Sequence, residues 1–350
     1  MKVKSFGLIA GLAMCALLAT VPSEARVQQY FDGQGNLYLE YEYSDSSNAV
    51  LRYSRFDTTT GDKTSETRYV YNSEGKRTQI NTFTYSKDSS GNLQEIRQNE
   101  QEYDPATGSR TRLTYFDSNT NTKSYEYLYR PDNQQLSYTR FDTATGEKTS
   151  ETRYVYNSDG KRTELNQYVY EKDASGNLEE RLQSATEYYP DTGNQKRRVQ
   201  YNTSTNQKTY EYTYDSSGRM TGYMRFDSAG SMIYKDERIY GDDGKIKEIK
   251  EYGLNESGEF VVDKISSYEY YPNGNSKKTV QVKMIGDEAK TISEINYYEN
   301  GRTQSQAYYD QSTGAKTYDY TYDENGRQSS YQRYASDGTT VTNRYEYTYN

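Results

Sequence analysis

The sequence has 350 residues, with 51 acidic and 43 basic side chains, a formal net charge of −8, 43 tyrosines, one cysteine and no histidine. The lack of histidine excludes a Ser-His-Asp triad, and the single cysteine excludes an internal disulfide and a Cys/His metal site. The two signs of charge are interspersed, which argues against the clustered basic surface that nucleic acids require. We therefore expect no cofactor, no metal and no nucleic-acid partner.

The chain begins with the pattern of an export signal. A charged start is followed by an apolar run over 6–21 and by small residues at Ser23 and Ala25, the spacing of a signal-peptidase site. We expect residues 1–25 to be a signal peptide and the protein to be periplasmic, on the cell surface or secreted. Because a membrane-spanning helix needs roughly 20 apolar residues, we expect no span here. Cys15 leaves a lipoprotein cleavage site open as an alternative.

Residues 26–350 contain clear internal repeats. The segment 55–77 returns almost unchanged at 140–162, an offset of 85 residues (140 − 55 = 85). A diverged copy starts at Arg225, and a fourth start lies at Arg333. Repeats of this kind indicate one extended array of similar units, so we predict a single β-repeat domain over 26–350.

Turn signals punctuate each repeat at intervals of about 10–15 residues. Examples are Asp57-Thr-Thr-Thr-Gly61, Asn72-Ser-Glu-Gly75 and Asp88-Ser-Ser-Gly91. The first residue can hydrogen-bond the backbone ahead of it, and the glycine can adopt the positive φ that short hairpins need. The segments between turns are rich in Tyr, Thr, Val and Arg, which is the composition of strands. Short connections force consecutive strands to pair antiparallel, so we predict an all-β antiparallel meander of about 24 strands.

Two forms of this long repeat sheet are compatible with the sequence. A strand over 147–156 places Thr149, Glu151 and Arg153 on one face and Thr152 and Tyr154 on the other, so neither face is dry. A flat single-layer sheet with such faces resembles that of spirochaete outer surface proteins, held by cross-strand pairs. A sheet of more than ~10 strands also tends to twist or coil. Both forms stay open at this point.

Some turn segments resemble a known type of repeat. Tyr212-Thr-Tyr-Asp-Ser-Ser-Gly-Arg219 and Tyr320-Thr-Tyr-Asp-Glu-Asn-Gly-Arg327 resemble the YD repeats of bacterial RHS-type wall and toxin-shell proteins, and Tyr297-Tyr-Glu-Asn-Gly-Arg302 resembles MORN-like repeats. Other copies depart from the pattern, with Tyr71-Asn and Tyr240-Gly in place of Tyr-Asp. The resemblance implies a secreted or surface β-repeat protein and brings no catalytic residues with it.

Tyrosine at every second position is the sharpest candidate for a binding surface, because alternate residues of a strand share one face. The candidate residues are Tyr125, Tyr127 and Tyr129, then Tyr210, Tyr212 and Tyr214, then Tyr318, Tyr320 and Tyr322. Their rings could stack on the faces of sugars. The alternative is that the rings cover the sheet itself and replace missing aliphatic side chains.

We expect no enzyme. Acidic residues recur in every repeat, whereas a glycosidase needs one acid whose pKa is raised in an apolar pocket, and apolar residues are scarce. The predicted function is a non-enzymatic, extended structural or interaction surface, and the alternative is a carbohydrate- or cell-wall-binding module that uses tyrosine platforms. The partner would be a glycan or cell-surface component. Terminal strands near 26–31 and 339–349 also offer edges for self-association.

Overall fold

The computed structural model describes residues 26–45 and 47–349. These residues form 24 antiparallel strands in one open sheet and contain no helix, which confirms the predicted all-β fold class. Within this part of the chain there is accordingly no helix long and apolar enough to cross a membrane. The predicted signal peptide and Cys15 lie outside the described residues.

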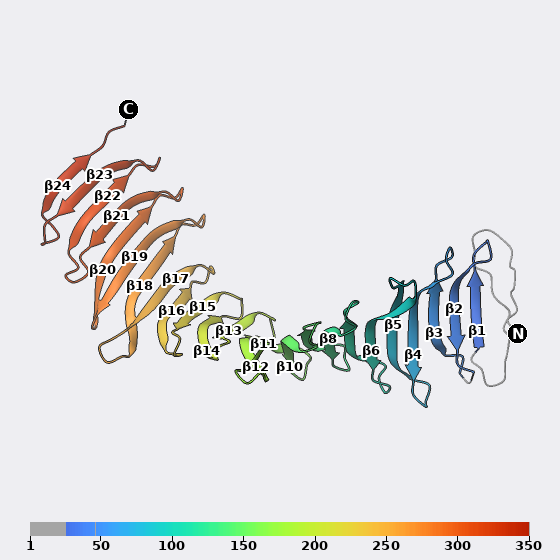
Figure 1. The fold of residues 1–350 in the computed structure, drawn as a ribbon. Coiled ribbons are helices and arrows are strands. Elements are labelled where there is room, and N and C mark those ends of the chain that lie inside the picture. Colours follow the sequence, from blue (N-terminus) through green and yellow to red (C-terminus); the bar gives the residue numbers. More distant parts are fainter. Residues whose placement is uncertain (1–25, 46, 350) are drawn as a thin grey trace. The chain divides into compact units, whose positions relative to one another are not determined.

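The chain divides into two compact units between Gln183 and Ser184, inside strand β12. The first unit, blue to green in Figure 1, contains β1 (Arg26–Phe31), β2 (Leu37–Tyr43), β3 (Val50–Phe56), β4 (Lys63–Tyr71), β5 (Arg77–Lys87), β6 (Leu93–Tyr103), β7 (Arg110–Phe116), β8 (Lys123–Tyr129), β9 (Gln135–Phe141), β10 (Lys148–Tyr156), β11 (Arg162–Lys172) and the start of β12 (Leu178–Tyr188).

The second unit contains the rest of β12, followed by β13 (Gln195–Asn202), β14 (Gln207–Tyr214), β15 (Met220–Phe226), β16 (Met232–Tyr240), β17 (Ile246–Leu254), β18 (Phe260–Tyr270), β19 (Ser276–Ile285), β20 (Glu288–Tyr297), β21 (Thr303–Tyr309), β22 (Lys316–Tyr322), β23 (Gln328–Tyr334) and β24 (Val341–Glu346). In both units the strands follow one another side by side in chain order (Figure 1).

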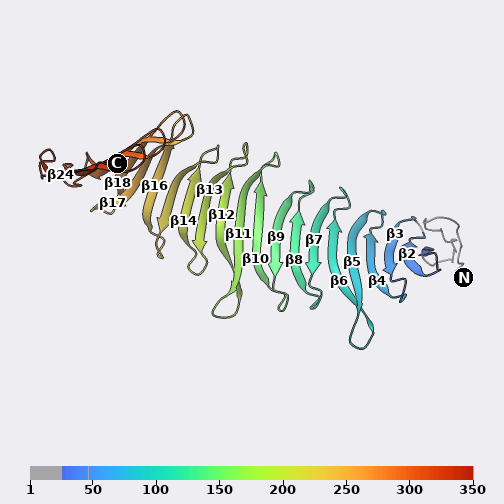
Figure 2. The ribbon, with the colours of Figure 1, turned by 90° about the horizontal axis from the view of Figure 1, so that it is seen from above.

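Each unit is a single-layer meander. Consecutive strands pair antiparallel from β1 to β11 and from β12 to β24. Among the described residues, strands of one unit contact only their neighbours along the chain, so no second layer covers either face. The β5–β6 hairpin, with 11 residues in each strand, projects beyond its neighbours (Figure 2).

The hairpin turns follow the predicted chemistry. At the first turn, Asp32 Oδ1 accepts hydrogen bonds from the backbone N–H of Gln34 (2.9 Å) and Asn36 (2.8 Å), and Gly35 has φ of 86°. The longer turn after β3 uses Asp57 in the same way, and Gly61 has φ of 76°. Because an L-residue is disfavoured at positive φ, the glycine fixes where such a hairpin reverses.

The two faces of the sheet differ in chemistry. On β4, Glu66 and Arg68 point to one face, and Thr67 and Tyr69 point to the other. The strand register carries this division across each unit, because Ser54 lies opposite Glu66 and Tyr53 lies opposite Thr67. We call the side of Glu66 the charged face and the other side the tyrosine face. In the second unit, Glu211 and Tyr212 define the same two faces.

A dry hydrophobic core is nearly absent from the described residues. The buried apolar side chains are Phe83, Leu113 and Val199, whereas twelve polar or charged residues are buried. The sheet is therefore held by its backbone hydrogen bonds and by polar and aromatic side-chain contacts rather than by apolar burial alone.

Tyrosines at the rim of the sheet add a regular backbone contact. Tyr71, the last residue of β4, donates its hydroxyl to the carbonyl of Val50 at 3.0 Å. Tyr156 and Tyr240 repeat the contact in later copies, with hydroxyl–carbonyl distances of 2.8 and 2.6 Å. Each such bond satisfies a carbonyl at the end of a strand and anchors one strand end to another.

Candidate functional site

Four clusters of tyrosine rings lie on the tyrosine face, two in each unit. Cluster 1 contains Tyr30, Tyr41, Tyr43 and Tyr53; cluster 2 contains Tyr115, Tyr125, Tyr127, Tyr129 and Tyr138; cluster 3 contains Tyr210, Tyr212, Tyr223 and Tyr234; cluster 4 contains Tyr308, Tyr318, Tyr320, Tyr331 and Tyr345. Equivalent strands of successive repeats supply them, so the repeat of the sequence becomes a repeat of aromatic surface.

A directly opposed pair of rings forms the centre of each cluster. In cluster 2, Tyr127 of β8 lies opposite Tyr138 of β9, and their ring centroids are 4.9 Å apart. Tyr125 stacks on Tyr138 at 5.9 Å with an interplanar angle of 13°. Tyr125 is 39% exposed and its neighbours are half-buried, so one side of the ring array faces outward. The central pairs of clusters 1, 3 and 4 have centroid distances of 5.0, 5.3 and 5.1 Å.

Burial and mutual contact raise the pKa of one tyrosine in each central pair. Burial is the larger cause for Tyr41, Tyr127, Tyr223 and Tyr320, and the neighbouring phenol of each central pair adds to it. A charged phenolate is disfavoured in such a place. These four phenols therefore stay neutral at ordinary pH and present ring faces and hydroxyls rather than charge.

Seven of the nine predicted candidate residues lie in these clusters; they are Tyr125, Tyr127, Tyr129, Tyr210, Tyr212, Tyr318 and Tyr320. The other two lie at the rim. Tyr214 and Tyr322 make no ring contact within the described part of the chain, and their carbonyls accept hydroxyl hydrogen bonds from Tyr189 (2.9 Å) and Tyr298 (2.8 Å).

Sequence reasoning missed the second half of each cluster. The opposing ring comes from the following strand, in a Tyr-x-Arg pattern that returns in every copy: Tyr53-Ser-Arg55, Tyr138-Thr-Arg140, Tyr223-Met-Arg225 and Tyr331-Gln-Arg333. The recurrence of this pattern one hairpin after each tyrosine-rich strand was the available signal.

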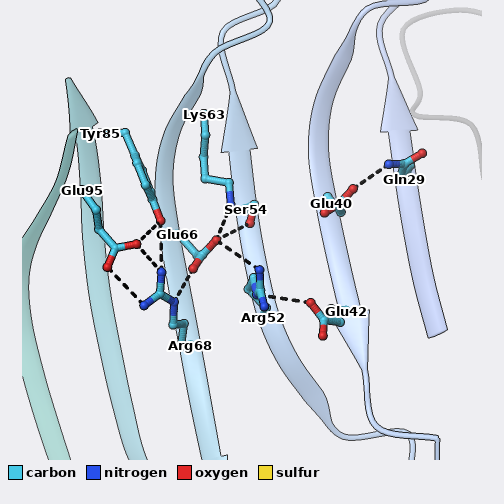
Figure 3. Close-up of polar contacts among 10 residues, drawn as sticks. All are labelled: Gln29, Glu40, Glu42, Arg52, Ser54, Lys63, Glu66, Arg68, Tyr85 and Glu95. Atoms are coloured by element: carbon cyan, nitrogen blue, oxygen red, sulfur yellow. Dashed lines mark hydrogen bonds and ion pairs between the residues drawn. The ribbon is translucent and has the colours of Figure 1, made fainter. Parts of the chain in front are cut away.

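The charged face carries buried carboxylates in ion-pair networks (Figure 3). The side chain of Glu66 has no exposed surface; its carboxylate pairs with Lys63 and Arg68 and accepts a 3.2 Å hydrogen bond from the Ser54 hydroxyl. Arg68 also reaches Glu95, to which the Tyr85 hydroxyl donates at 2.7 Å. The next copy repeats this network with Glu151, Arg153, Glu180 and Tyr170.

These networks keep their carboxylates ionised. Burial tends to raise the pKa of Glu66, but hydrogen bonds from Lys63 and Arg68 outweigh it and lower the pKa. At Glu151 burial is again outweighed, by Arg153, Tyr170 and Lys148, and the pKa is lowered to about 2. Within 26–45 and 47–349, no group of three or more acidic, histidine or cysteine side chains is placed to hold a metal. The arrangement suits structural cross-strand pairing rather than proton transfer.

The charge order of this network is reversed on β16. Lys235 and Glu237 occupy the places that Glu151 and Arg153 occupy on β10, with 2.7 Å between Lys235 Nζ and Glu237 Oε1. The opposing residues differ too. Glu237 lies opposite Lys250, whereas Arg153 lies opposite a neutral residue, Asn166.

The lowered pKa of Glu151 predicts acid sensitivity. Its ordinary pKa is 4.5 and its folded pKa is about 2. A depressed pKa contributes stability above the unfolded value, and that contribution is lost as pH falls from about 4.5 through about 2. We expect Glu151→Gln to be less stable than wild type at neutral pH and the difference to shrink across this interval. Denaturant unfolding at a series of pH values, followed by far-UV circular dichroism, measures it, and a pH-independent difference would contradict the assignment.

Comparisons with known proteins assign no family. No family model matches the sequence, and no curated protein matches it. Among solved structures, the chain is similar to that of TcdB2-TccC3, with 13% identity and a TM-score of 0.24 over 89% of this chain. It spans about a fifth (20%) of the length of that chain. It is also similar to a porin-like protein from Bacteroides uniformis, with 11% identity and a TM-score of 0.15 over 73% of this chain and 93% of that one. With TM-scores this low, neither match carries an argument about fold or function.

Proposed function

We propose that this β-repeat protein is exported and non-enzymatic, and that its tyrosine face is an extended interaction surface. The observation that carries the proposal is the recurrence of a half-exposed tyrosine cluster at equivalent strands of successive repeats. Aromatic residues supply large contact areas at low entropic cost, and repeat proteins use such continuous faces for binding. Over residues 26–45 and 47–349, no second layer covers this face within either unit.

Export and the absence of catalysis rest on separate observations. The signal pattern over 1–25 and the likeness of Tyr212–Arg219 to the YD repeats of RHS-type proteins support an exported surface protein. The buried carboxylates recur from copy to copy, and basic partners hold Glu66 and Glu151 ionised. An active-site acid is held protonated at its working pH, so these groups favour a structural role. Self-association through β1 and β24 stays a prediction.

A carbohydrate- or cell-wall-binding module is the second candidate. The observation in its favour is the parallel stacking of Tyr125 on Tyr138, with Tyr125 39% exposed. The nearly parallel rings expose an apolar ring face of Tyr125 for the C–H face of a sugar, with hydroxyls beside it for hydrogen bonds. The absence of tryptophan from the sequence leaves tyrosine as the platform residue.

A comparison of the two faces tests the proposal. Tyr125→Ser, Tyr210→Ser and Tyr318→Ser together remove one ring, at an equivalent strand position, from each of three clusters. Tyr168→Ser, Tyr252→Ser and Tyr334→Ser together are the matched control, because these rings lie on the charged face. Each protein, once its β-content is confirmed by far-UV circular dichroism, is sedimented with envelopes of the producing cell and with purified peptidoglycan.

We expect wild type and the control to bind envelopes and the tyrosine-face variant to lose most binding, because each ring contact contributes about 1 kcal/mol. If the tyrosine-face variant also loses binding to purified peptidoglycan, the result would support the cell-wall-binding function. Equal binding by both variants would contradict a role for the tyrosine face. Release of reducing ends from the peptidoglycan by wild type would contradict the non-enzymatic assignment.

A further inference from the structure

An arginine flanks each tyrosine cluster. It lies two residues after the opposing tyrosine and on the same face, and its side chain is exposed in every copy; the four are Arg55, Arg140, Arg225 and Arg333. In the first unit the arginine touches the cluster directly. Arg55 Nε donates to the Tyr53 hydroxyl at 2.5 Å, and Arg140 Nε donates to the Tyr138 hydroxyl at 2.8 Å.

These four arginines lack the carboxylate partners that are common elsewhere in the protein. Across the described ranges 26–45 and 47–349, no acidic side chain lies within 4.0 Å of their guanidinium nitrogens. By contrast, Arg153 on the charged face pairs with both Glu151 and Glu180. An exposed guanidinium that binds only phenols keeps free donors, and its planar fork matches a carboxylate in a bidentate arrangement.

At three clusters, no acidic side chain lies opposite the arginine on the neighbouring strand. The residues opposite Arg55, Arg140 and Arg333 on the outer strand are Ser65, Ser150 and Asn343. A carboxylate docking there meets one cation and neutral groups. The whole chain has a net charge of −8, whereas the surroundings of these three arginines are locally positive. This local positive charge favours an anionic ligand.

Cluster 3 differs. Asp236 lies opposite Tyr223 at the centre of the cluster, and Glu251 lies opposite Asp236 on the next strand. Arg238 and Lys264 pair with these two carboxylates at 3.2 and 2.7 Å. Arg225 therefore shares its side of the sheet with two carboxylates and their two basic partners, so a docked carboxylate would meet like charges there that it does not meet at clusters 1, 2 and 4.

We propose that clusters 1, 2 and 4, each with its arginine, are subsites for acidic sugar residues, and that the ligand is a polysaccharide of uronic acids. The sugar ring stacks on the tyrosines and its carboxylate pairs with the arginine. This proposal rests on the carbohydrate-binding form of the function above and adds the class of sugar. A polymer fits better than a single sugar, because an exposed ion pair changes an equilibrium only about two- to fivefold and several linked contacts are needed for useful affinity.

The experiment compares ligands that separate the effect of the carboxylate charge from that of the sugar rings. Purified protein is titrated with polygalacturonate and with alginate, each also as its methyl ester, and with polyglutamate, which has carboxylates but no sugar rings. The test variant combines Arg55→Gln, Arg140→Gln and Arg333→Gln. The matched control combines Arg77→Gln, Arg219→Gln and Arg327→Gln, which removes the same charge from arginines that stack on the rim tyrosines Tyr103, Tyr240 and Tyr349.

We expect at least one of the two acidic polysaccharides to bind about tenfold more tightly than its ester and than polyglutamate. The test variant should lose about tenfold in affinity and the control less than about threefold. Arg225→Gln alone should change the affinity less than Arg140→Gln alone. Circular dichroism confirms that each variant keeps its strands, so a loss of binding is not a loss of fold.

The opposite results separate this proposal from the broader one. Equal affinity for acid and ester, unchanged in the test variant, would overturn the acidic subsite and leave a carbohydrate-binding function standing. Equal affinity for polyglutamate would show simple charge attraction and overturn the subsite as well. Binding to none of the polysaccharides, with envelope binding through the tyrosine face retained, would overturn the carbohydrate form and leave the interaction surface.

Discussion

Glu66→Ala is expected to destabilise the first unit by about 2–3 kcal/mol. The Glu66 side chain has no exposed surface and neutralises Lys63 and Arg68, while Arg52 lies 3.9 Å away. Removing one partner of a buried ion pair costs about 3–5 kcal/mol because the remaining charges are left unpaired. Here the basic partners are partly exposed and water can solvate them, which reduces the expected cost.

Glu95→Ala is the matched control, because Glu95 belongs to the same network but its side chain is 38% exposed. We expect it to cost less than about 1 kcal/mol. Denaturant unfolding gives the free energies, and hydrogen exchange of the amides of β4 shows whether the loss is local. Equal destabilisation by the two substitutions would contradict the view that burial of Glu66 is what matters.

Gly338→Ala is expected to cost about 2–4 kcal/mol and to release β24 from β23. Gly338 ends the turn between these strands with φ of 71°, which disfavours an L-residue by about 1–2 kcal/mol. A Cβ atom there would also lie 2.8 Å from the backbone nitrogen of Lys316 and 3.0 Å from Cα of Ala315. Backbone cannot rotate away as a side chain can, so the crowding adds to the conformational cost.

Gly286→Ala separates the two causes. Gly286 also has a positive φ, of 59°, but a Cβ atom there would meet nothing within 4 Å. It should therefore show the conformational cost alone, about 1–2 kcal/mol. Exchange rates of the β23 and β24 amides measure the first substitution, and those of β19 and β20 measure the second. The increase in amide exchange rate over wild type is compared between the two variants. If Gly338→Ala shows no larger increase than Gly286→Ala, the crowding against β22 relaxes without a cost in free energy.

Strand number, strand direction and most turns could be predicted from the sequence, because hairpins depend on local chemistry. Turns without glycine were harder. Asn121, Asn133 and Asn206 take the positive φ that glycine takes elsewhere, with values of 57°, 64° and 54°. Asparagine tolerates this conformation, but it also occurs in strands and at other turn positions, so composition alone does not mark these three sites.

The sequence predicts which tyrosines of one strand share a face, but not which rings of the neighbouring strand they meet. Period two placed Tyr210 and Tyr212 on one face, but their partner Tyr223 depends on the register between β14 and β15. The same alternation does not tell which rings contact one another, because Tyr129 touches Tyr127 whereas Tyr214 and Tyr322 make no ring contact within the described residues. The strand register shifts immediately before all three tyrosines, at Leu128/Tyr129, Thr213/Tyr214 and Thr321/Tyr322, so the shift alone does not decide which ring makes a contact.

Burial of Glu66 was beyond sequence reasoning for a different reason. Alternation along the strand places Glu66 and Arg68 on one face but does not say whether that carboxylate is buried. What closes the site is the Arg68–Glu95 contact from a strand 27 residues away, together with Ser54 on the preceding strand. Which of many similar carboxylates becomes buried thus depends on side chains that only the folded sheet brings together.

The reversed charges on β16 have a consequence for folding. Near-identical repeats can exchange strands while the chain is still forming, and such exchange is a common error of repeat proteins. If β10 took the place of β16, Arg153 would lie opposite Lys250, and like charges in direct register are unfavourable. The inverted pair therefore makes the pairing of β17 with β16 electrostatically favourable and its pairing with β10 unfavourable. This difference opposes strand exchange between copies that share one fold.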